Sequence, residues 1–217
     1  MRSYGQYCTV AKALDVVGDR WTLLLVRELL LRGACRYTDL RDGLPGIATN
    51  LLAERLRQLE DAGVVSREEA PPPVATTLFH LTPRGAELEP AIKALGRWGA
   101  PFMEQPDAGE AFRGHWLALP AELFLTDNTP ESPPITIQVR TGDECVLLET
   151  ADGGVRARVG FDEDADAVIS GSPPLVLGTL TGRLGVAEAR RRGLDYRGKL
   201  DTLRRVQPPI GAGKASP

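Results

Sequence analysis

Residues 47–67 read IATNLLAERLRQLEDAGVVSR, and this stretch predicts a helix that ends at a glycine and continues directly into a strand. Leu52, Leu56 and Leu59 recur at positions i, i+4 and i+7, so they form one buried stripe along the helix. Gly63 stands where a residue in the left-handed conformation commonly closes a helix. The other side of the helix is short and polar and carries one long cation: Asn50, Ala53, Glu54 and Arg57. Such a face suits a helix that lies in the major groove of DNA.

The residues before this helix complete a helix-turn-helix pattern. Residues 10–17 and 21–31 predict two apolar helices, residues 37–41 predict a short third helix, and residues 43–46, GLPG, turn the chain. A short helix, a tight turn and a longer helix form the helix-turn-helix arrangement, in which the second helix enters the major groove.

The residues after this helix predict a wing. Residues 64–68 and 76–81 are expected to form two strands, and the prolines at 71–73 join them into a hairpin. A helix is expected over residues 83–99, with Thr82 as its N-cap and Pro83 at its first position.

A second unit with a different pattern follows an expected linker at residues 105–109. The expected elements are strands at 135–140, 144–150, 155–161 and 167–171, helices at 173–184 and 186–192, a short strand at 195–200 and a last helix at 202–206. The fold class is therefore expected to be α+β, with a winged helix-turn-helix domain before a smaller domain of an antiparallel sheet and helices. The expected boundaries are 1–106 for the first domain, 107–207 for the second and 208–217 for a disordered tail.

Composition restricts the class of protein only weakly. The chain has 217 residues and a net charge of −3, and residues 1–106 hold 13 basic and 13 acidic side chains. A DNA-binding protein of this composition needs a local basic face rather than a basic domain. No apolar run approaches the length of a membrane-spanning helix, and the first residues lack the apolar core of a signal peptide, so a cytoplasmic protein is expected.

Several short motifs over the first hundred residues resemble the HxlR family of bacterial winged helix-turn-helix regulators. The matching segments are CTVA at 8–11, VGDRWTLL at 17–24, LLAERL at 51–56, EDAGVV at 60–65, LTPRG at 81–85 and WG at 98–99. The resemblance implies a homodimer that binds an inverted-repeat operator and is held together by the first and last helices of the unit. Wings of this family often carry basic residues near the tip, whereas the tip here, residues 70–74, reads APPPV.

The second unit is similar, more loosely, to sterol carrier protein-like domains. The similarity rests on ADAVISGSP at 165–173, LVLGTL at 175–180 and GVAEA at 185–189. Such domains pack a strand layer against helices around an apolar cavity, which implies an effector-binding or dimer-extending module. The side chains expected to line the cavity are Trp116, Phe124, Val176, Leu177, Leu180 and Leu184. The same residues would also serve an ordinary core.

The predicted DNA contacts follow the chemistry of the bases and phosphates. They are Arg36, Thr38, Thr49, Asn50, Ala53, Glu54, Arg55, Arg57, Arg67 and Arg84. Asn pairs well with adenine and Arg with guanine, so Asn50 and Arg57 are expected to read base edges, and Arg84 is assigned to phosphate. Thr49 is expected to cap the helix or to donate to a phosphate. Glu54 accepts either from a cytosine amino group or from Arg57 or Gln58 along the helix.

Three further residues have two interpretations each. Cys8 begins the first helix one turn before Lys12, where a thiol either senses oxidants or packs as a small residue at a dimer interface. Trp21 and Trp98 are interpreted as core anchors rather than functional groups.

The sequence thus favours a DNA-binding regulator that an apolar effector or chemistry at Cys8 modulates. The alternative is a carrier of a hydrophobic ligand whose winged helix mediates protein contacts. No nucleophile, phosphate-loop or metal-ligand motif is present in the sequence, so neither an enzyme nor a cofactor is expected. The expected partners are double-stranded DNA, a second copy of the chain and an apolar small molecule, without a membrane.

Overall fold

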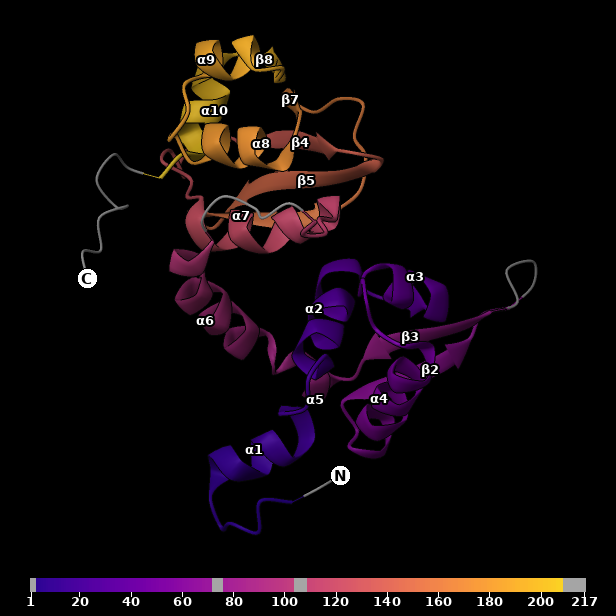
Figure 1. Ribbon diagram of the computed structural model, residues 1–217. Helices are drawn as coiled ribbons and strands as arrows, with labels where there is room; N and C mark the ends of the chain where they lie inside the picture. The colour runs from indigo at the N-terminus through magenta and orange to yellow at the C-terminus, as the bar shows by residue number, and fades with distance from the viewer. Residues whose placement is uncertain (1–2, 72–75, 104–108, 209–217) are drawn as a thin grey trace. The chain divides into compact units, whose positions relative to one another are not determined.

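A computed structural model describes residues 3–71, 76–103 and 109–208 of the chain. It contains two compact units, Met1–Leu95 (unit 1) and Gly96–Pro217 (unit 2), and Figure 1 labels most of their helices and strands. Most of the expected linker and all but the first residue of the expected tail lie outside the described residues.

Unit 1 has the element order of a winged helix-turn-helix. Its elements are α1 (Thr9–Val17), α2 (Thr22–Arg32), β1 (Cys35–Arg36), α3 (Tyr37–Asp42), α4 (Thr49–Asp61), β2 (Val65–Glu69), β3 (Thr77–Leu81), α5 (Pro83–Ala86) and the larger part of α6 (Glu89–Gly99). The strands form an antiparallel sheet of order β1-β3-β2, in which β2 and β3 are the expected hairpin. The helix-turn-helix and the hairpin predicted from the sequence are therefore confirmed.

The helix expected over residues 83–99 is wrong as a single element. It divides into α5 and α6, with a turn at Glu87 and Leu88. Pro90 explains the break, because a proline has no N–H to donate to the carbonyl four residues earlier and disfavours helical geometry in the residue before it. The predicted N-cap is confirmed, since Gly85 N donates to Thr82 Oγ1 at 3.0 Å.

A buried apolar core joins the helices of unit 1 to its sheet. Its most buried side chains include Leu25, Val26, Leu29, Leu40, Leu44, Leu52, Leu56, Leu59, Val65 and Phe79. One buried carboxyl lies beside this core: a Cβ on Gly43 would stand 2.0 Å from Oε2 of Glu28. Glycine at position 43 therefore leaves the space that the Glu28 side chain occupies.

Unit 2 consists of a five-stranded sheet with helices packed on it. Its elements after α6 are η1 (Ala100–Phe102), η2 (Gly114–Leu117), α7 (Ala118–Phe124), β4 (Thr136–Thr141), β5 (Glu144–Ala151), β6 (Gly154–Val159), β7 (Ala167–Ser170), α8 (Pro173–Leu180), α9 (Val186–Arg191), β8 (Asp195–Gly198) and α10 (Leu200–Val206). The strand order is β6-β5-β4-β7-β8, with β4 in the centre. Ile137, Gln138 and Val139 of β4 are all buried, so this strand is covered on both faces.

The expectation that the sheet of the second domain is antiparallel is wrong for one pair of strands. Strands β4 and β7 run parallel, because the chain leaves the edge strand β6, crosses the sheet through residues 160–166 and enters again beside β4. Within this crossing, Asp162 N donates to Gln138 Oε1 at 2.8 Å.

The expected β5–β6 hairpin is confirmed, whereas the expected ends of two helices need correction. Helix α8 ends at Leu180 rather than at Leu184, because Gly182 follows in a left-handed conformation with φ +73°. Helix α10 begins at Leu200 rather than at residue 202, directly after β8 ends at Gly198.

A buried ion pair fastens α10 to the loop that follows α7. Arg205 donates to both carboxylate oxygens of Asp127, with Nε–Oδ1 at 2.8 Å and Nη2–Oδ2 at 2.9 Å. The side chains are only 10% and 3% exposed. The hydrogen bonds from Arg205 hold the pKa of the Asp127 carboxyl below its usual range.

We predict that Asp127→Asn destabilises unit 2 by about 3–5 kcal/mol at neutral pH, because it leaves the buried guanidinium without its counter-charge. Since the folded pKa of Asp127 is lowered, the contribution is complete above the unfolded value of about 3.9 and is lost as the pH falls from there through the folded pKa. Urea unfolding of the wild type and variant across this pH range measures the difference. Asp152→Asn is the control, because the Arg156–Asp152 pair is 73% and 80% exposed. Equal effects of the two substitutions would contradict the assignment.

Candidate nucleic-acid interface

The turn between α3 and α4 is fixed by a side-chain hydrogen bond and by a left-handed glycine. Tyr37 Oη, at the start of α3, donates to the carbonyl oxygen of Thr49, at the start of α4, at 2.6 Å. Gly46 adopts φ +88°, which is costly for other residues, and Ile47 beside it is buried. The direction in which α4 leaves the turn is thereby set.

Helix α4 has the two faces that the sequence predicts. Leu52, Leu56 and Leu59 are buried, with relative exposures of 0%, 2% and 1%. The exposed residues of the helix are Thr49, Asn50, Ala53, Glu54, Arg57 and Asp61. The helix therefore presents a continuous outward surface from its first turn to its last.

Two of the exposed side chains remain available for an external partner. Within the part of the chain that the structure describes, neither Asn50 nor Arg57 makes a side-chain hydrogen bond or an ion pair. Glu54 accepts from Gln58 Nε2 at 3.1 Å, which is the second of the two alternatives for this residue. The surface of α4 thus offers an amide and a guanidinium, the groups that recognise adenine and guanine.

Arg55 is not part of this outward surface. Its guanidinium pairs with Asp19, just before α2, and also donates to Gln58 on its own helix, and its side chain is only 14% exposed. Thr49 likewise does not cap α4, because the N-cap is Ala48 and makes no side-chain cap. The structure therefore assigns Arg55 to the scaffold, and the cap expected at Thr49 is wrong.

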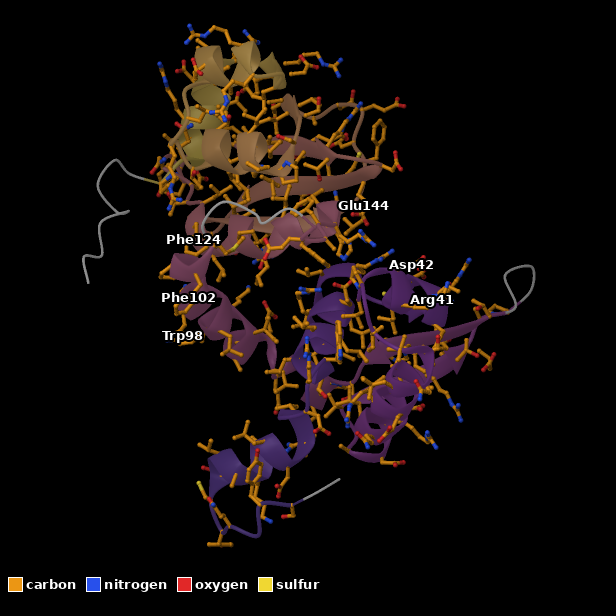
Figure 2. All side chains as sticks on the ribbon, in the orientation of Figure 1. Arg41, Asp42, Trp98, Phe102, Phe124 and Glu144 are labelled. Atoms are coloured by element: carbon orange, nitrogen blue, oxygen red, sulfur yellow. The ribbon has the colours of Figure 1, made fainter. Side chains whose placement is uncertain are left out.

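The remaining predicted contacts lie on the surface around α4. Arg36 and Thr38 are exposed at the start of α3, and Arg84 is exposed in α5. Arg67 on β2 is exposed but lies 3.4 Å from Oε1 of Glu60. Arg41 at the end of α3 is half-exposed and lies 3.8 Å from the carboxylate of Asp42; both are labelled in Figure 2.

The described part of the wing adds little positive charge. Strand β2 continues from Arg67 into Glu68 and Glu69, and Thr77 Oγ1 of β3 donates to Glu69 Oε1 at 2.7 Å. Residues 72–75 of the expected wing tip lie outside the described residues. His80 contacts Ser66 across the hairpin at 3.0 Å, consistent with a structural role.

The two tryptophans interpreted as core anchors differ in their surroundings. Trp21 precedes α2 in a left-handed conformation, is half-buried, and would lie 3.8 Å from a Cβ on Gly46. Trp98 on α6 is 70% exposed, and its ring contacts the ring of Phe102 with centroids 5.1 Å apart (Figure 2). The interpretation of Trp98 as a core anchor is therefore wrong, because its amphipathic helix turns this side chain outward.

The described residues of unit 2 enclose a small apolar pocket. The pocket has a volume of about 40 Å³ and lies between α7, β4, β5 and α8. Phe124, Leu177 and Leu180 line it as expected, whereas Trp116, Val176 and Leu184 do not. Small-molecule pockets usually measure roughly 300–1,000 Å³. The described pocket is thus smaller than a typical small-molecule site, and aliphatic side chains of α8 form part of its wall.

The cysteines of unit 1 occupy opposite environments. Cys8 is exposed at the N-cap of α1, where its carbonyl accepts from Lys12 N at 2.9 Å. Cys35 is buried in β1, and burial raises the pKa of its thiol to about 11. Of these two thiols, only that of Cys8 is accessible to a soluble oxidant.

Two features, a metal site and a membrane-spanning helix, are absent from the described residues. No group of three or more His, Cys, Asp or Glu side chains there could hold a metal ion. Over the same residues, no helix is both long and apolar enough to cross a membrane.

A protein-family model described as HxlR-like helix-turn-helix matches residues 16–107, the segment that contains α2 to α6. An HTH-type transcriptional regulator of Synechocystis sp., itself uncharacterized, is 36% identical over 101 residues, which are 46% of this chain and 74% of that protein. The chain belongs to the HxlR-like helix-turn-helix family.

Further relatives match the same half of this HxlR-like protein. YvaP, an uncharacterized HTH-type transcriptional regulator of Bacillus subtilis, is 32% identical over 93 residues, covering 43% of this chain and 85% of that protein. The reduced form of the transcriptional regulator YodB from B. subtilis is 28% identical, with a TM-score of 0.40, and covers 47% of this chain and all of that one.

We predict that Arg55→Ala lowers the stability of unit 1 by about 1 kcal/mol, because it removes the partner of Asp19 and a largely buried stem. The matched substitution is Arg57→Ala, two residues further along the same helix and on its exposed side. It should change stability by less than about 0.5 kcal/mol. Thermal unfolding of the two variants measures this contrast. If Arg57→Ala were the more destabilising of the pair, the assignment of the two arginines would be reversed.

Proposed function

We propose that this HxlR-like protein is a DNA-binding transcriptional regulator that reads base edges with α4. The observation that carries the proposal is the pair of exposed, unpartnered side chains, Asn50 and Arg57, on the outward face of the second helix of a helix-turn-helix. Membership of a family whose named relatives are transcriptional regulators supports the same conclusion. The proposal includes neither a catalytic activity nor a cofactor.

The side chains around α4 divide into two roles. Asn50 reads adenine and Arg57 reads guanine in the major groove, and the small Ala53 between them allows close approach to the bases. Thr49 and Thr38, with Arg36 and Arg84, contact phosphates and fix the position of the helix. Their contribution is insensitive to base sequence.

We further propose that the protein acts as a homodimer on an inverted repeat, with its two recognition helices about 34 Å apart. Apolar side chains exposed on α1 and α6 support this assembly: Val10, Leu14, Leu95 and Trp98. Helices with such exposed side chains bury them at low cost against a second copy. Oxidation of the exposed Cys8 thiol, at the start of α1, would then alter the same interface. The cytoplasm is the expected compartment.

The role of unit 2 is proposed from its architecture. A strand layer packed against helices around an apolar pocket supports the similarity to sterol carrier protein-like domains. A pocket of about 40 Å³ has room for about three water molecules, so it supports neither an apolar effector nor the alternative of a hydrophobic-ligand carrier. We therefore propose that unit 2 is a packing or dimer-extending module of the regulator.

We predict that Asn50→Ala or Arg57→Ala weakens binding to the operator by roughly 1–3 kcal/mol and changes binding to unrelated DNA little. Arg84→Ala should weaken binding to both DNAs about equally, because a phosphate contact does not distinguish sequences. A footprint on the DNA beside the protein's own gene locates the operator, and titration of labelled duplexes gives the affinities. Unchanged operator affinity in both α4 variants would refute the proposed recognition surface.

The dimer is tested by its exposed tryptophan. We predict that Trp98→Glu produces a monomer at micromolar concentration, because it places a charge within an apolar interface. Leu200→Glu is the matched control, since Leu200 is 48% exposed on α10 and lies on neither α1 nor α6. Sedimentation velocity of the wild type and both variants measures the assembly. A monomeric wild type would exclude the proposed dimer.

A further inference from the structure

Basic and acidic side chains are strongly segregated within the second half of the chain. Residues 107–182 contain 4 basic and 13 acidic side chains, whereas residues 183–206 contain 8 basic and 3 acidic ones. A chain with a net charge of −3 therefore carries a local excess of positive charge in one short segment.

The fold gathers this segment at one end of unit 2, which we call the basic end. It comprises the turn after α8 together with α9, β8 and α10, and Figure 1 shows these elements close together. Arg190 of α9 donates to the carbonyl of Tyr196 in β8 at 2.5 Å, and Tyr196 Oη donates to the carbonyl of Lys199 at 2.7 Å. The exposed cations of the basic end are Arg183, Arg190, Arg191, Arg192, Arg197, Lys199 and Arg204.

Within the described residues, acids outside this segment pair with none of the exposed cations of the basic end. Arg191 pairs with Glu188, Arg197 lies 3.6 Å from Asp195, and Arg204 lies 3.1 Å from Asp201, so these pairs use the three acids of the segment itself. Arg205, a mostly buried cation of this segment, pairs instead with Asp127, one of the acids of residues 107–182. Exposed pairs of this kind contribute about 0–1 kcal/mol and exchange readily with other anions.

Three of the exposed cations have no such pair. Within the described residues, Arg183, Arg192 and Lys199 make no side-chain hydrogen bond or ion pair. Arg190 and Arg191 are favoured at the end of α9 by the helix dipole, but Arg183, Lys199 and Arg197 lie outside that helix. Local helix stability therefore does not account for the whole basic end.

We propose that the basic end is a second DNA-binding surface, which contacts the phosphate backbone without reading sequence. This inference rests on the proposed function, because it assumes that the same chain holds DNA through α4. Unit 1 is poorly equipped for backbone attraction: residues 1–106 are balanced in charge, Arg55 and Arg67 are paired with acids, and the described part of the wing is acidic. The basic end supplies the charge that unit 1 lacks.

The test neutralises the two unpaired cations that flank β8 in the full-length protein, Arg192→Gln with Lys199→Gln. Each phosphate contact contributes about 0.9 to the slope of log affinity against log salt, so the double variant should lose up to about 1.8 from that slope. Binding at about 50 mM salt should weaken more than tenfold on the operator and on an unrelated duplex alike. The matched control is Arg156→Gln with Arg158→Gln, two exposed cations on β6, which should leave the slope unchanged.

Fluorescence anisotropy between about 50 and 200 mM salt gives both slopes, and thermal unfolding confirms that each variant is folded. An unchanged slope in the Arg192/Lys199 variant, or an equal loss in the Arg156/Arg158 control, would overturn the proposal. Two other results would also overturn it. In the first, the wild type binds anionic phospholipid vesicles, and the double variant loses this binding but keeps its affinity for DNA. In the second, the double substitution changes only the oligomeric state of the protein. Failure of the proposed function gives a different result, in which the wild type has no preference for the operator that Asn50→Ala could remove.

Discussion

The burial of three leucines on α4 is the constraint on which the interface depends. Leu52, Leu56 and Leu59 are almost inaccessible, and burying each such side chain contributes about 1.5–3 kcal/mol. The helix cannot rotate about its axis without exposing them, so the same packing that stabilises unit 1 also holds Asn50 and Arg57 outward. The orientation of the recognition surface therefore depends on how these three leucines pack in the core.

Two polar contacts further fix the position that the buried leucines give to α4. The hydrogen bond from Tyr37 Oη to the carbonyl of Thr49 fixes the start of α4, and the pair of Arg55 with Asp19 joins its middle to the start of α2. Arg55 and Arg57 are thus near neighbours in the sequence with opposite duties. Arg55 stabilises the position of the helix, whereas the side chain of Arg57 stays exposed.

The periodic elements could be predicted from the sequence, whereas features that depend on distant residues could not. The leucine spacing, Gly63 and Thr82–Pro83 each carry a local signal, and each was confirmed. Strand β1 has two residues and therefore no period, and the parallel pairing of β4 with β7 depends on where a crossing chain returns. Asp19 and Arg55 are 36 residues apart, so no spacing rule connects them. The sequence could not distinguish the lining of a cavity from a filled core, because both use the same aliphatic residues.

The distribution of charge also separates two properties that DNA-binding proteins often combine in one surface. Affinity for the phosphate backbone depends on cations of any position, whereas selectivity depends on a few side chains that meet base edges. In this protein the helix that presents Asn50 and Arg57 belongs to a unit of balanced charge, and the concentrated cations lie on β8 and its flanking helices. A recognition helix with little general attraction discriminates well, because incorrect sequences gain almost nothing from it. Under the two proposals made above, substitutions in different units adjust selectivity and affinity, with small effects of one upon the other.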